Sequence, residues 1–237
     1  MNAMYFDWTY VIFVLPAVLF AAWASRRVNS TFAKYKNTSN SRGLTGAAAA
    51  RQVLDRNGLT NVRIEHIQGS LTDHYDPSAN VIRLSDTVYG STSAVAVGVA
   101  CHECGHAIQH ATNYLPVKIR TAIVPITNFG AKISVPLIII GLILASMSEY
   151  GLLIAYLGIA CFGLSAVFQL VTLPTEFNAS NRALKTIDET GLLRGEEFEQ
   201  AKKVLSAAAL TYVAALAVAL AQLFRFLVLV GNRGNRR

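Results

Sequence analysis

Charged residues are scarce in this sequence. They make up 15% of its 237 residues, whereas 53% of the residues are hydrophobic. An ordinary soluble domain contains about 25% charged residues, so the shortage favours a membrane protein of one or two domains. The net charge of +7 does not indicate nucleic-acid binding, because Lys and Arg cluster beside apolar runs and no basic helix with interleaved aromatic residues is present.

Cysteine is also rare, with three residues in all. This small, odd number implies no disulfide framework. Cys101 and Cys104 form a CxxC, but the chain lacks the second CxxC of a four-cysteine zinc site, and no thioredoxin-like βαβ pattern surrounds the first. We therefore interpret the two thiols as small side chains packed inside a helix.

Positive charge is missing before the first apolar run, residues 8–25, where only Asp7 is charged. The "AWA" within this run resembles a signal-peptide cleavage site, yet a signal peptide begins with basic residues. Basic residues without any acid follow the run instead, which is typical of a signal anchor whose next loop stays in the cytoplasm. They are Arg26, Arg27, Lys34, Lys36 and Arg42.

Long apolar runs are what the sequence does contain. Four of them, at residues 8–25 and roughly 123–147, 151–173 and 207–230, approach or exceed the roughly 20 residues of a transmembrane helix. The link between the second and third runs has Glu149 but no Lys or Arg, which fits the outer face. Basic residues after the third run indicate a return to the cytoplasm. They are Arg182, Lys185, Arg194, Lys202 and Lys203.

The topology of the fourth run is left open by the sequence. Arg225 lies near its end, where the side chain can snorkel to the membrane surface. If the run crosses, the arginines of the tail "GNRGNRR" reach the outer face, against the positive-inside rule. A full crossing and a partial one both stay open.

The polar segment between the first two runs, residues 27–120, predicts a small α+β region. "GLTGAAAARQVLDRNGL" indicates a short amphipathic helix that ends at Asn57-Gly58, and "NVRIEHI" alternates like a half-buried strand. "LTDHYDPSANVIRLSD" predicts two strands joined by a turn at residues 76–80. "GSTSAVAVGVACHECGHAIQHATN" then predicts a helix with Ser91 or Ser93 as its N-cap.

This last helix contains an H-E-x-x-H motif, formed by His102, Glu103 and His106. Residues four apart lie on one face of a helix, so both imidazoles can bind one zinc ion. The carboxylate of Glu103 can then reach a water at that ion and act as a general base. The motif predicts zinc-dependent hydrolysis, and polar residues on a solvated helix face are the alternative.

Three of the five histidines fall within residues 102–110, which favours the zinc site. His110 lies one turn beyond the motif, as an outer hydrogen-bond donor or a surface residue. The metzincin motif needs a third histidine ten positions after the first. That position is Thr112, so the metzincin class is excluded.

A catalytic zinc needs a third protein ligand and an open fourth position. Glu176 is the preferred candidate, because "LPTEFNASNRAL" follows the third apolar run at the predicted start of a helix, and a two-span hairpin returns the chain to its starting face. The alternative role for Glu176 is an N-terminal acid that complements the helix dipole. The other acids on that side are Asp188, Glu189, Glu196, Glu197 and Glu199.

The segments "ACHECGHAIQH", "LPTEFNASNRAL" and "AKKVLSAAALTYVAALAVAL", in this order, resemble those of the YugP-type zinc membrane metallopeptidases of bacteria. This family is gluzincin-like and is related in pattern to the HtpX and CaaX prenyl proteases. The likeness extends from the first apolar run through the fourth. It implies that His102, His106 and Glu176 bind one Zn²⁺ ion and that Glu103 is the general base.

One position departs from the wider gluzincin pattern. There an acid follows the ligand glutamate by four positions and orients a zinc-bound histidine, but this chain has Ser180. Serine can form the hydrogen bond without bringing the charge, so the tuning of the zinc must differ. Candidates for supplying what is missing are Asn178, Asn181 and Arg182, and candidates for stabilising the oxyanion are Tyr75, His74 and Arg182.

We therefore predict a membrane α-helical protein with a small α+β metallopeptidase domain on about four transmembrane helices. The domain contains the HExxH helix, a short antiparallel sheet and a third-ligand helix. The predicted segments are an N-terminal anchor (1–26), a cytoplasmic zincin-like region (27–120), a transmembrane hairpin (121–174), a third-ligand helical segment (175–206), and a C-terminal membrane helix with a basic tail (207–237).

The resemblance also implies that an extended substrate binds along a sheet edge, where backbone hydrogen bonds supply affinity. This edge is predicted at Leu71–Tyr75 or at Val81–Leu84, and a purely structural hairpin is the alternative for either strand. We expect polypeptide substrates, such as misfolded or membrane proteins, in contact with a lipid bilayer and without nucleic acid. The oligomeric state is left open.

The predicted function is a zinc-dependent endopeptidase of the bacterial cytoplasmic (inner) membrane, multi-pass, with its active site facing the cytoplasm. A site-2-type intramembrane protease is disfavoured, because the apolar stretch before His102, residues 94–101, is far shorter than the roughly 20 residues of a span. A non-catalytic zinc-binding membrane scaffold would tolerate loss of the base, yet Glu103 is present.

Overall fold

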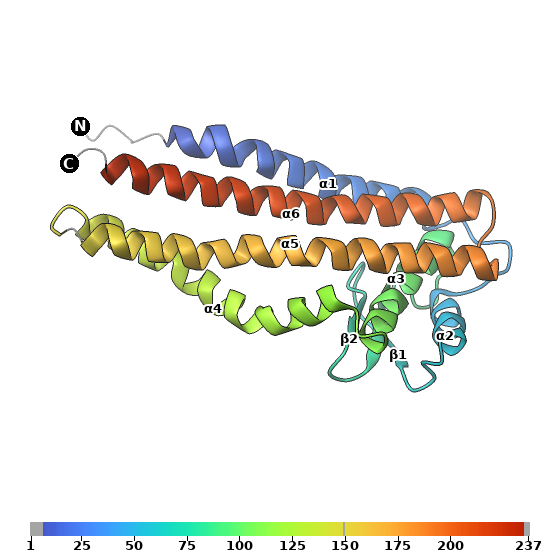
Figure 1. Cartoon of the computed structure of the whole chain (residues 1–237). Coiled ribbons are helices and arrows are strands. Elements are labelled where there is room, and N and C mark those ends of the chain that lie inside the picture. Colours follow the sequence, from blue (N-terminus) through green and yellow to red (C-terminus); the bar gives the residue numbers. More distant parts are fainter. Residues whose placement is uncertain (1–6, 149, 235–237) are drawn as a thin grey trace. The chain divides into compact units, whose positions relative to one another are not determined.

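The computed structural model describes residues 7–148 and 150–234. Parts of three predicted segments lie outside the described residues: the first six residues of the anchor, Glu149 in the link, and residues 235–237 of the tail. Figure 1 shows the elements along the chain. They are the π-helical turn η1 (Tyr10–Val14), α1 (Leu15–Tyr35), α2 (Gly46–Arg56), β1 (Arg63–Ile67), β2 (His74–Asp76), β3 (Val81–Ser85), α3 (Ala94–Ala111), α4 (Leu115–Leu144), α5 (Tyr150–Thr190) and α6 (Glu196–Gly234).

Four helices among the described residues are long and apolar enough to cross a membrane. They are η1 continued by α1, and the helices α4, α5 and α6. Helix α3, which carries the HExxH motif, is not among them. Together with the small sheet, these helices confirm the predicted fold class.

The helices of the polar segment begin and end where local chemistry predicts. The hydroxyl of Thr45 caps α2, and Gly58 adopts a left-handed φ of +72° just after this helix, a conformation that glycine tolerates without strain. Helix α3 is capped by Ser93, whose hydroxyl accepts the N–H of Ala96 at 3.2 Å. The structure thus selects Ser93 over Ser91 as the N-cap.

The chain forms two compact units. The site unit consists of Ala24–Lys118 and Pro174–Leu210, and the span unit consists of Ile119–Leu173 with the described parts of Met1–Trp23 and Thr211–Arg237. Helices α1, α4, α5 and α6 contribute residues to both units. The HExxH motif and Glu176 both belong to the site unit.

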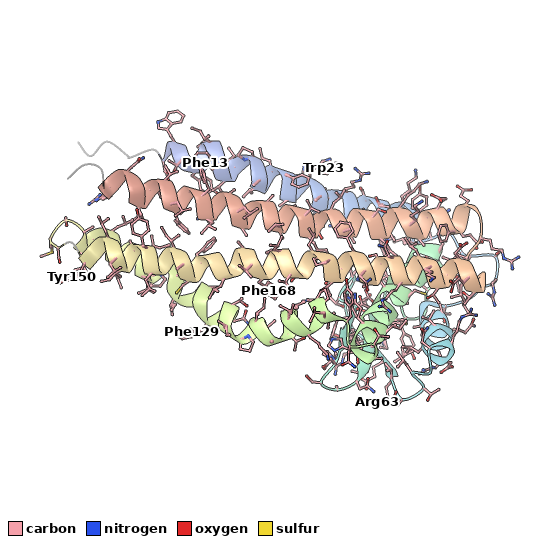
Figure 2. The ribbon with its side chains drawn as sticks, in the orientation of Figure 1. Phe13, Trp23, Arg63, Phe129, Tyr150 and Phe168 are labelled. Atoms are coloured by element: carbon pink, nitrogen blue, oxygen red, sulfur yellow. The ribbon has the colours of Figure 1, made fainter. Side chains whose placement is uncertain are left out.

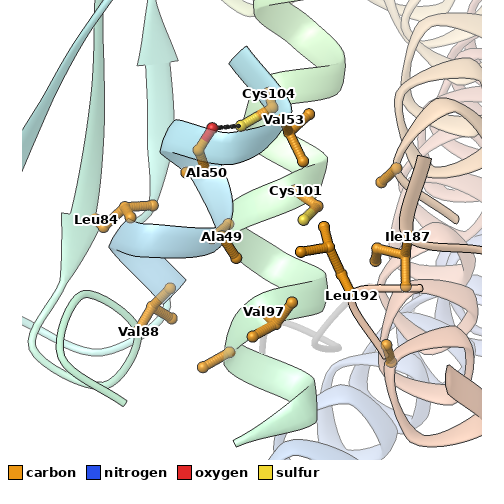
Figure 3. Close-up of a cluster of buried hydrophobic side chains, with 14 of the residues drawn as sticks. Ala49, Ala50, Val53, Leu84, Val88, Val97, Cys101, Cys104, Ile187 and Leu192 are labelled. Carbon is orange, nitrogen blue, oxygen red and sulfur yellow. Dashed lines mark hydrogen bonds between the residues drawn. The ribbon is translucent and has the colours of Figure 1, made fainter. Parts of the chain in front are cut away.

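The site unit has a hydrophobic core like that of a soluble protein. Side chains from α2, β3, α3 and α5 meet in this core, as Figure 3 shows. Many of them are alanine or valine, so the backbones of α2 and α3 lie close together. The most deeply buried include Ala49, Ala50, Val53, Leu84, Val88, Val97, Cys101, Ile187 and Leu192.

The sheet has the order β1-β3-β2. Strand β3 pairs antiparallel with β2 through the predicted turn, and parallel with β1. The sheet is therefore mixed, and the prediction of an antiparallel sheet was correct only for the hairpin. Because β3 has a partner on each side, Val81–Leu84 cannot be the free edge, and that alternative was wrong. Strand β2 is an edge strand.

The span unit buries few side chains and exposes many. Its buried cluster contains Ile138, Ala155, Ile159, Phe226 and Val230. Large apolar side chains point outward along its helices, and Figure 2 shows several of its aromatic residues. Among them, Phe129 is 66% exposed. This outward apolar surface is what a lipid environment favours.

Arg225 forms an ion pair inside the span unit. Its Nε and Nη2 donate to Oδ2 of Asp7 at 3.0 and 2.5 Å, and its guanidinium carbon lies 5.5 Å from the centroid of the Tyr10 ring. The guanidinium of Arg225, which was expected to snorkel to the membrane surface, is therefore paired with the carboxylate of Asp7. The contact also brings the end of α6 beside the start of the first span.

Glu176 lies inside a helix, not at the start of one. Helix α5 runs without interruption from the third apolar run to Thr190, with Pro174 within it. The predicted helix start before Glu176 was therefore wrong, and so was the alternative role as an N-terminal acid. Proline lacks an N–H and costs one backbone hydrogen bond, but it does not end a helix that tertiary packing supports.

Candidate metal centre

Helix α3 presents the two histidines of the HExxH motif on one face. Their spacing of four residues brings the rings of His102 and His106 to a centroid distance of 4.8 Å, edge to face. The helix itself is held by core packing, because most of its other residues are buried. The imidazoles therefore project from a rigid support toward α5.

A glycine in the motif sets the distance between α3 and α5. A Cβ atom on Gly105 would lie 2.5 Å from the carbonyl oxygen of Ala179 and 3.0 Å from its Cα. Only glycine permits this close approach of the two backbones. The contact places Glu176, almost one turn before Ala179, opposite the two histidines.

The three predicted ligands converge. Oε2 of Glu176 lies 3.4 Å from Nε2 of His102 and 3.5 Å from Nε2 of His106, and one ligand atom from each residue lies within 4.8 Å of the others. Ligands about 2.0–2.1 Å from a tetrahedral zinc are roughly 3.3 Å apart. The two nitrogens and one carboxylate oxygen therefore have the chemistry and spacing of a zinc site.

The outer nitrogen of each histidine has its own polar contact. Nδ1 of His102 lies 3.0 Å from the hydroxyl of Ser180, and Nδ1 of His106 lies 3.0 Å from Oε1 of Gln109. When Nε2 faces a metal, Nδ1 carries the proton and donates to these oxygens. Ser180 therefore makes a hydrogen bond to His102 without adding a negative charge.

Gln109 is the site residue that the sequence interpretation missed. Its side chain is fully buried, and its Nε2 donates to the backbone oxygen of Thr175 at 2.8 Å and to Oδ1 of Asn178 at 3.0 Å. It therefore links His106 to the helix that carries Glu176. A glutamine three residues after the second histidine, and so on the same helix face, was the available signal.

Asn178 and Arg182 extend this network along α5. Nε of Arg182 donates to Oδ1 of Asn178 at 2.7 Å, and its guanidinium carbon lies 5.8 Å from the centroid of the Tyr114 ring. Asn181, the other candidate on this helix, is exposed. The structure thus connects two of the three candidates, Asn178 and Arg182, to His106 through Gln109.

Glu103 is buried, with only 7% of its surface exposed. Among the residues that the structure describes, none donates a hydrogen bond to its carboxylate.

The pKa of His106 reflects the acids around it. Burial by itself lowers this pKa, but the effects of Glu176, Glu103 and Gln109 are larger in sum, so the net pKa is raised. The site therefore has the negative potential that attracts a cation.

Tyr75 and His74 of β2 make hydrogen-bond contacts with residues beside the strands. The hydroxyl of Tyr75 donates to Oδ1 of Asn80 at 3.0 Å, and Nδ1 of His74 lies 2.9 Å from the backbone oxygen of Thr72. The ring of Tyr75 also packs against that of His110, 5.5 Å between centroids. This last contact joins edge strand β2 to the HExxH helix.

The other acids proposed as the third ligand have different surroundings. Glu197 accepts the backbone N–H of Ser41 at 2.6 Å, Glu189 pairs with Lys185 at 3.7 Å, and Glu199 pairs with Lys202 at 3.8 Å. Asp188 and Glu196 are exposed. Within the described residues, only Glu176 forms a possible metal-binding cluster with the two histidines.

The two cysteines of the motif are packing residues. Both thiols are free and buried, and Sγ of Cys104 contacts the backbone oxygen of Ala50 at 3.5 Å (Figure 3). Burial raises the pKa of Cys101 to about 12 and raises that of Cys104 well above its ordinary value. These properties are opposite to those of a redox pair, which needs accessible thiolates.

An HExxH helix, a carboxylate from a second helix and four membrane-length helices are together the features of the membrane metallopeptidase class. Comparison with known families agrees: residues 10–231 match the model of the "Putative neutral zinc metallopeptidase" family. The chain therefore belongs to this zinc peptidase family. It is also 44% identical over 223 residues to the "Putative membrane protease YugP" of Bacillus subtilis (strain 168). The aligned region covers 94% of this chain and 97% of that protein. The predicted resemblance is confirmed, and no solved structure matches the chain.

Proposed function

We propose that this protein is a zinc-dependent endopeptidase that hydrolyses peptide bonds at the cytoplasmic face of the bacterial inner membrane. The observation that carries the proposal is the convergence of His102, His106 and Glu176 beside a buried carboxylate, Glu103, that no described residue engages by a hydrogen bond. His102, His106 and Glu176 would hold one zinc ion. When bound, zinc lowers the pKa of a water to about 7 and polarises a carbonyl.

Glu103 is the general base in this proposal. It follows His102 directly on α3 and lies three residues before His106, so its carboxylate faces the same side of the site. It accepts a proton from the water that attacks the peptide carbonyl and then gives this proton to the departing amine. Ser180 and Gln109 hold the two imidazoles in position and keep their outer nitrogens protonated.

Strand β2 is the proposed substrate edge. It has β3 on one side only, and Tyr75 connects it to the HExxH helix through His110. An extended polypeptide can pair with the free side through its backbone, which gives affinity without strict sequence choice. Arg182, fixed by Asn178, is the proposed donor to the oxyanion.

The cytoplasmic orientation follows from the distribution of basic residues. The groups that follow the first and third spans, from Arg26 to Arg42 and from Arg182 to Lys203, all belong to the site unit. The link between α4 and α5 has no Lys or Arg. By the positive-inside rule, the site unit faces the cytoplasm. A substrate there is a misfolded or membrane-attached polypeptide.

The test separates metal binding from catalysis. In the purified full-length protein, we expect Glu103→Gln to retain one zinc per chain while casein cleavage falls by about 10²–10⁴-fold, the contribution of a general base. Glu176→Ala should lose most of its zinc, measured by elemental mass spectrometry. Glu189→Ala is the matched control, because Glu189 lies on the same helix but is exposed. Unchanged proteolysis by Glu103→Gln, or normal zinc content in Glu176→Ala, would refute these assignments.

A further inference from the structure

A basic groove lies between helices α1 and α6 in the site unit, away from the metal centre residues. Its volume is about 500 Å³, and it is lined by α1 from Arg27 to Tyr35 and by α6 from Glu199 to Ser206. Phe32 of α1 and Leu205 of α6 belong to one buried cluster, so these two helices are packed together beneath it. The groove is therefore a fixed feature of the fold.

Positive charge dominates this basic groove. Four cationic side chains line it, Arg27, Lys34, Lys202 and Lys203, against one acid, Glu199. The excess is three positive charges, four minus one. Oε1 of Glu199 lies 3.8 Å from Nζ of Lys202, so the single negative charge is paired with one of the four cations. Like charges gathered in a concave surface focus a positive potential that attracts anions.

The groove also has the hydrogen-bonding groups that a phosphate needs. Lys34 and Lys203 come from different helices, and their Nζ atoms lie 5.1 and 5.9 Å from the centroid of the same Tyr35 ring. The ring and both lysines line the groove, so the two ammonium groups gather around one aromatic face there. Hydroxyls of Ser30, Thr31 and Ser206 complete the lining. Ammonium and hydroxyl donors around one space match the several acceptor oxygens of a phosphate.

The groove adjoins two membrane spans in the sequence. Arg27 is the second residue after the first apolar run, and Ser206 directly precedes the fourth. The positive-inside rule accounts for basic residues near these spans, but it does not require them to face one another across two helices. Arg26 and Lys36, in the same segment, do not line the groove. The convergence of basic residues from α1 and α6 on one groove therefore indicates an anionic ligand, in addition to the membrane orientation that the positive-inside rule explains.

We propose that this groove binds a phosphate-bearing anion, supplied either by the headgroup of an anionic phospholipid or by free phosphate. The proposal depends on the groove alone and is independent of the proteolytic activity. The test uses the full-length protein in an uncharged detergent, titrated with short-chain phosphatidylglycerol, phosphatidylcholine or inorganic phosphate. Bound ligand is counted by native mass spectrometry.

The decisive variants remove equal charge inside and outside the groove. Lys34→Gln with Lys203→Gln should weaken phosphatidylglycerol binding roughly thirtyfold, because each basic residue near an anionic headgroup contributes about fivefold. Arg26→Gln with Lys36→Gln should bind as the natural chain does. Lys34→Arg with Lys203→Arg keeps both charges and should also bind. All four side chains are exposed, so the fold is preserved in each variant.

The two sources of phosphate give different outcomes. If phosphatidylglycerol binds and excess inorganic phosphate does not displace it, the ligand is the lipid headgroup. If inorganic phosphate binds alone and displaces the lipid, the ligand is free phosphate. The proposal is overturned if both double Gln variants bind phosphatidylglycerol equally, or if the natural chain binds phosphatidylcholine as tightly.

Discussion

The site unit and the span unit bury their side chains in opposite ways. In the site unit, large apolar residues such as Leu84 and Ile187 are fully buried, as they are in a protein that folds in water. In the span unit, Ile126 and Phe129 are 60% and 66% exposed. Exposure of this kind costs nothing in lipid, because hydrocarbon replaces the packing partner. One chain thus contains two solutions to the same burial problem.

Buried polar groups show the same contrast. In the site unit, the side chain of Gln109 connects α3 to α5. In the span unit, the buried hydroxyls of Thr127 and Ser134 donate to carbonyls three residues earlier in their own helix, at 3.0 and 2.9 Å. Gln109 therefore joins two helices of the site unit, whereas each of these two hydroxyls bonds only to its own helix.

The largest expected effect comes from truncating an apolar residue in each unit. Leu84→Ala should destabilise the site unit by about 2–5 kcal/mol, because it removes buried surface and leaves a cavity. Phe129→Ala, although a larger truncation, should change stability by no more than about 0.5 kcal/mol in detergent, as for other exposed positions. The measurement is the urea concentration at which the buried thiols Cys101 and Cys104 become labelled.

Thiol labelling reports the site unit because both cysteines lie in its core. Burial raises the pKa of Cys101 to about 12 and that of Cys104 well above its ordinary value, so these two cysteines have almost no reactive thiolate at neutral pH in the folded protein. Equal shifts of the labelling midpoint in Leu84→Ala and Phe129→Ala would show that the two units do not differ in how they use apolar surface.

The second prediction concerns glycines of the two units. Gly105→Ala should cost about 1–3 kcal/mol by overpacking and should remove most of the bound zinc, because its Cβ would lie 2.5 Å from the backbone of α5. Gly163→Ala in the span unit has open space around the new Cβ and should be neutral or stabilising, since alanine favours helix by about 1 kcal/mol. Zinc content and thermal unfolding of both variants provide the measurement.

A Gly105→Ala variant with full zinc content would indicate that α3 and α5 can separate without moving the ligands. Helix packing would then be less important for the site than the polar contacts of its side chains. Loss of zinc in Gly163→Ala would also contradict the prediction. It would mean that zinc binding does not depend on whether the glycine is packed against another backbone, as Gly105 is, or has open space around it, as Gly163 does.

Local patterns were sufficient for much of this structure. The helix with Ser91 or Ser93 as its cap, the turn before β3 and the HExxH spacing all depend on neighbouring residues, which the sequence displays directly. The convergence of Glu176 with the histidines was also expected, from topology and from the family resemblance. The structure confirms that the three lie together.

The features that sequence reasoning missed depend on contacts between distant segments. The parallel pairing of β1 with β3 leaves no mark in either strand's alternation. The continuity of α5 through Pro174 overrides a local helix-breaking signal, because packing on both sides of the proline supports the helix. The role of Gln109 requires that its partners on α5 be known, and they lie 66 and 69 residues further along the chain.

The smallest expected effect tests whether buried polar groups act differently in the two units. Gln109→Leu keeps a similar volume but removes the contact to Nδ1 of His106, and it should weaken zinc binding by about 10–100-fold, as loss of a ligand-orienting partner does. Ser134→Ala, equally buried, should leave zinc affinity unchanged, because its hydroxyl bonds only its own helix. Competition with a chelator measures both. The prediction fails if Gln109→Leu binds zinc normally while Ser180→Ala does not. In that case only the imidazole of His102 depends on the hydrogen bond to its Nδ1, and the buried glutamine serves only to join α3 to α5.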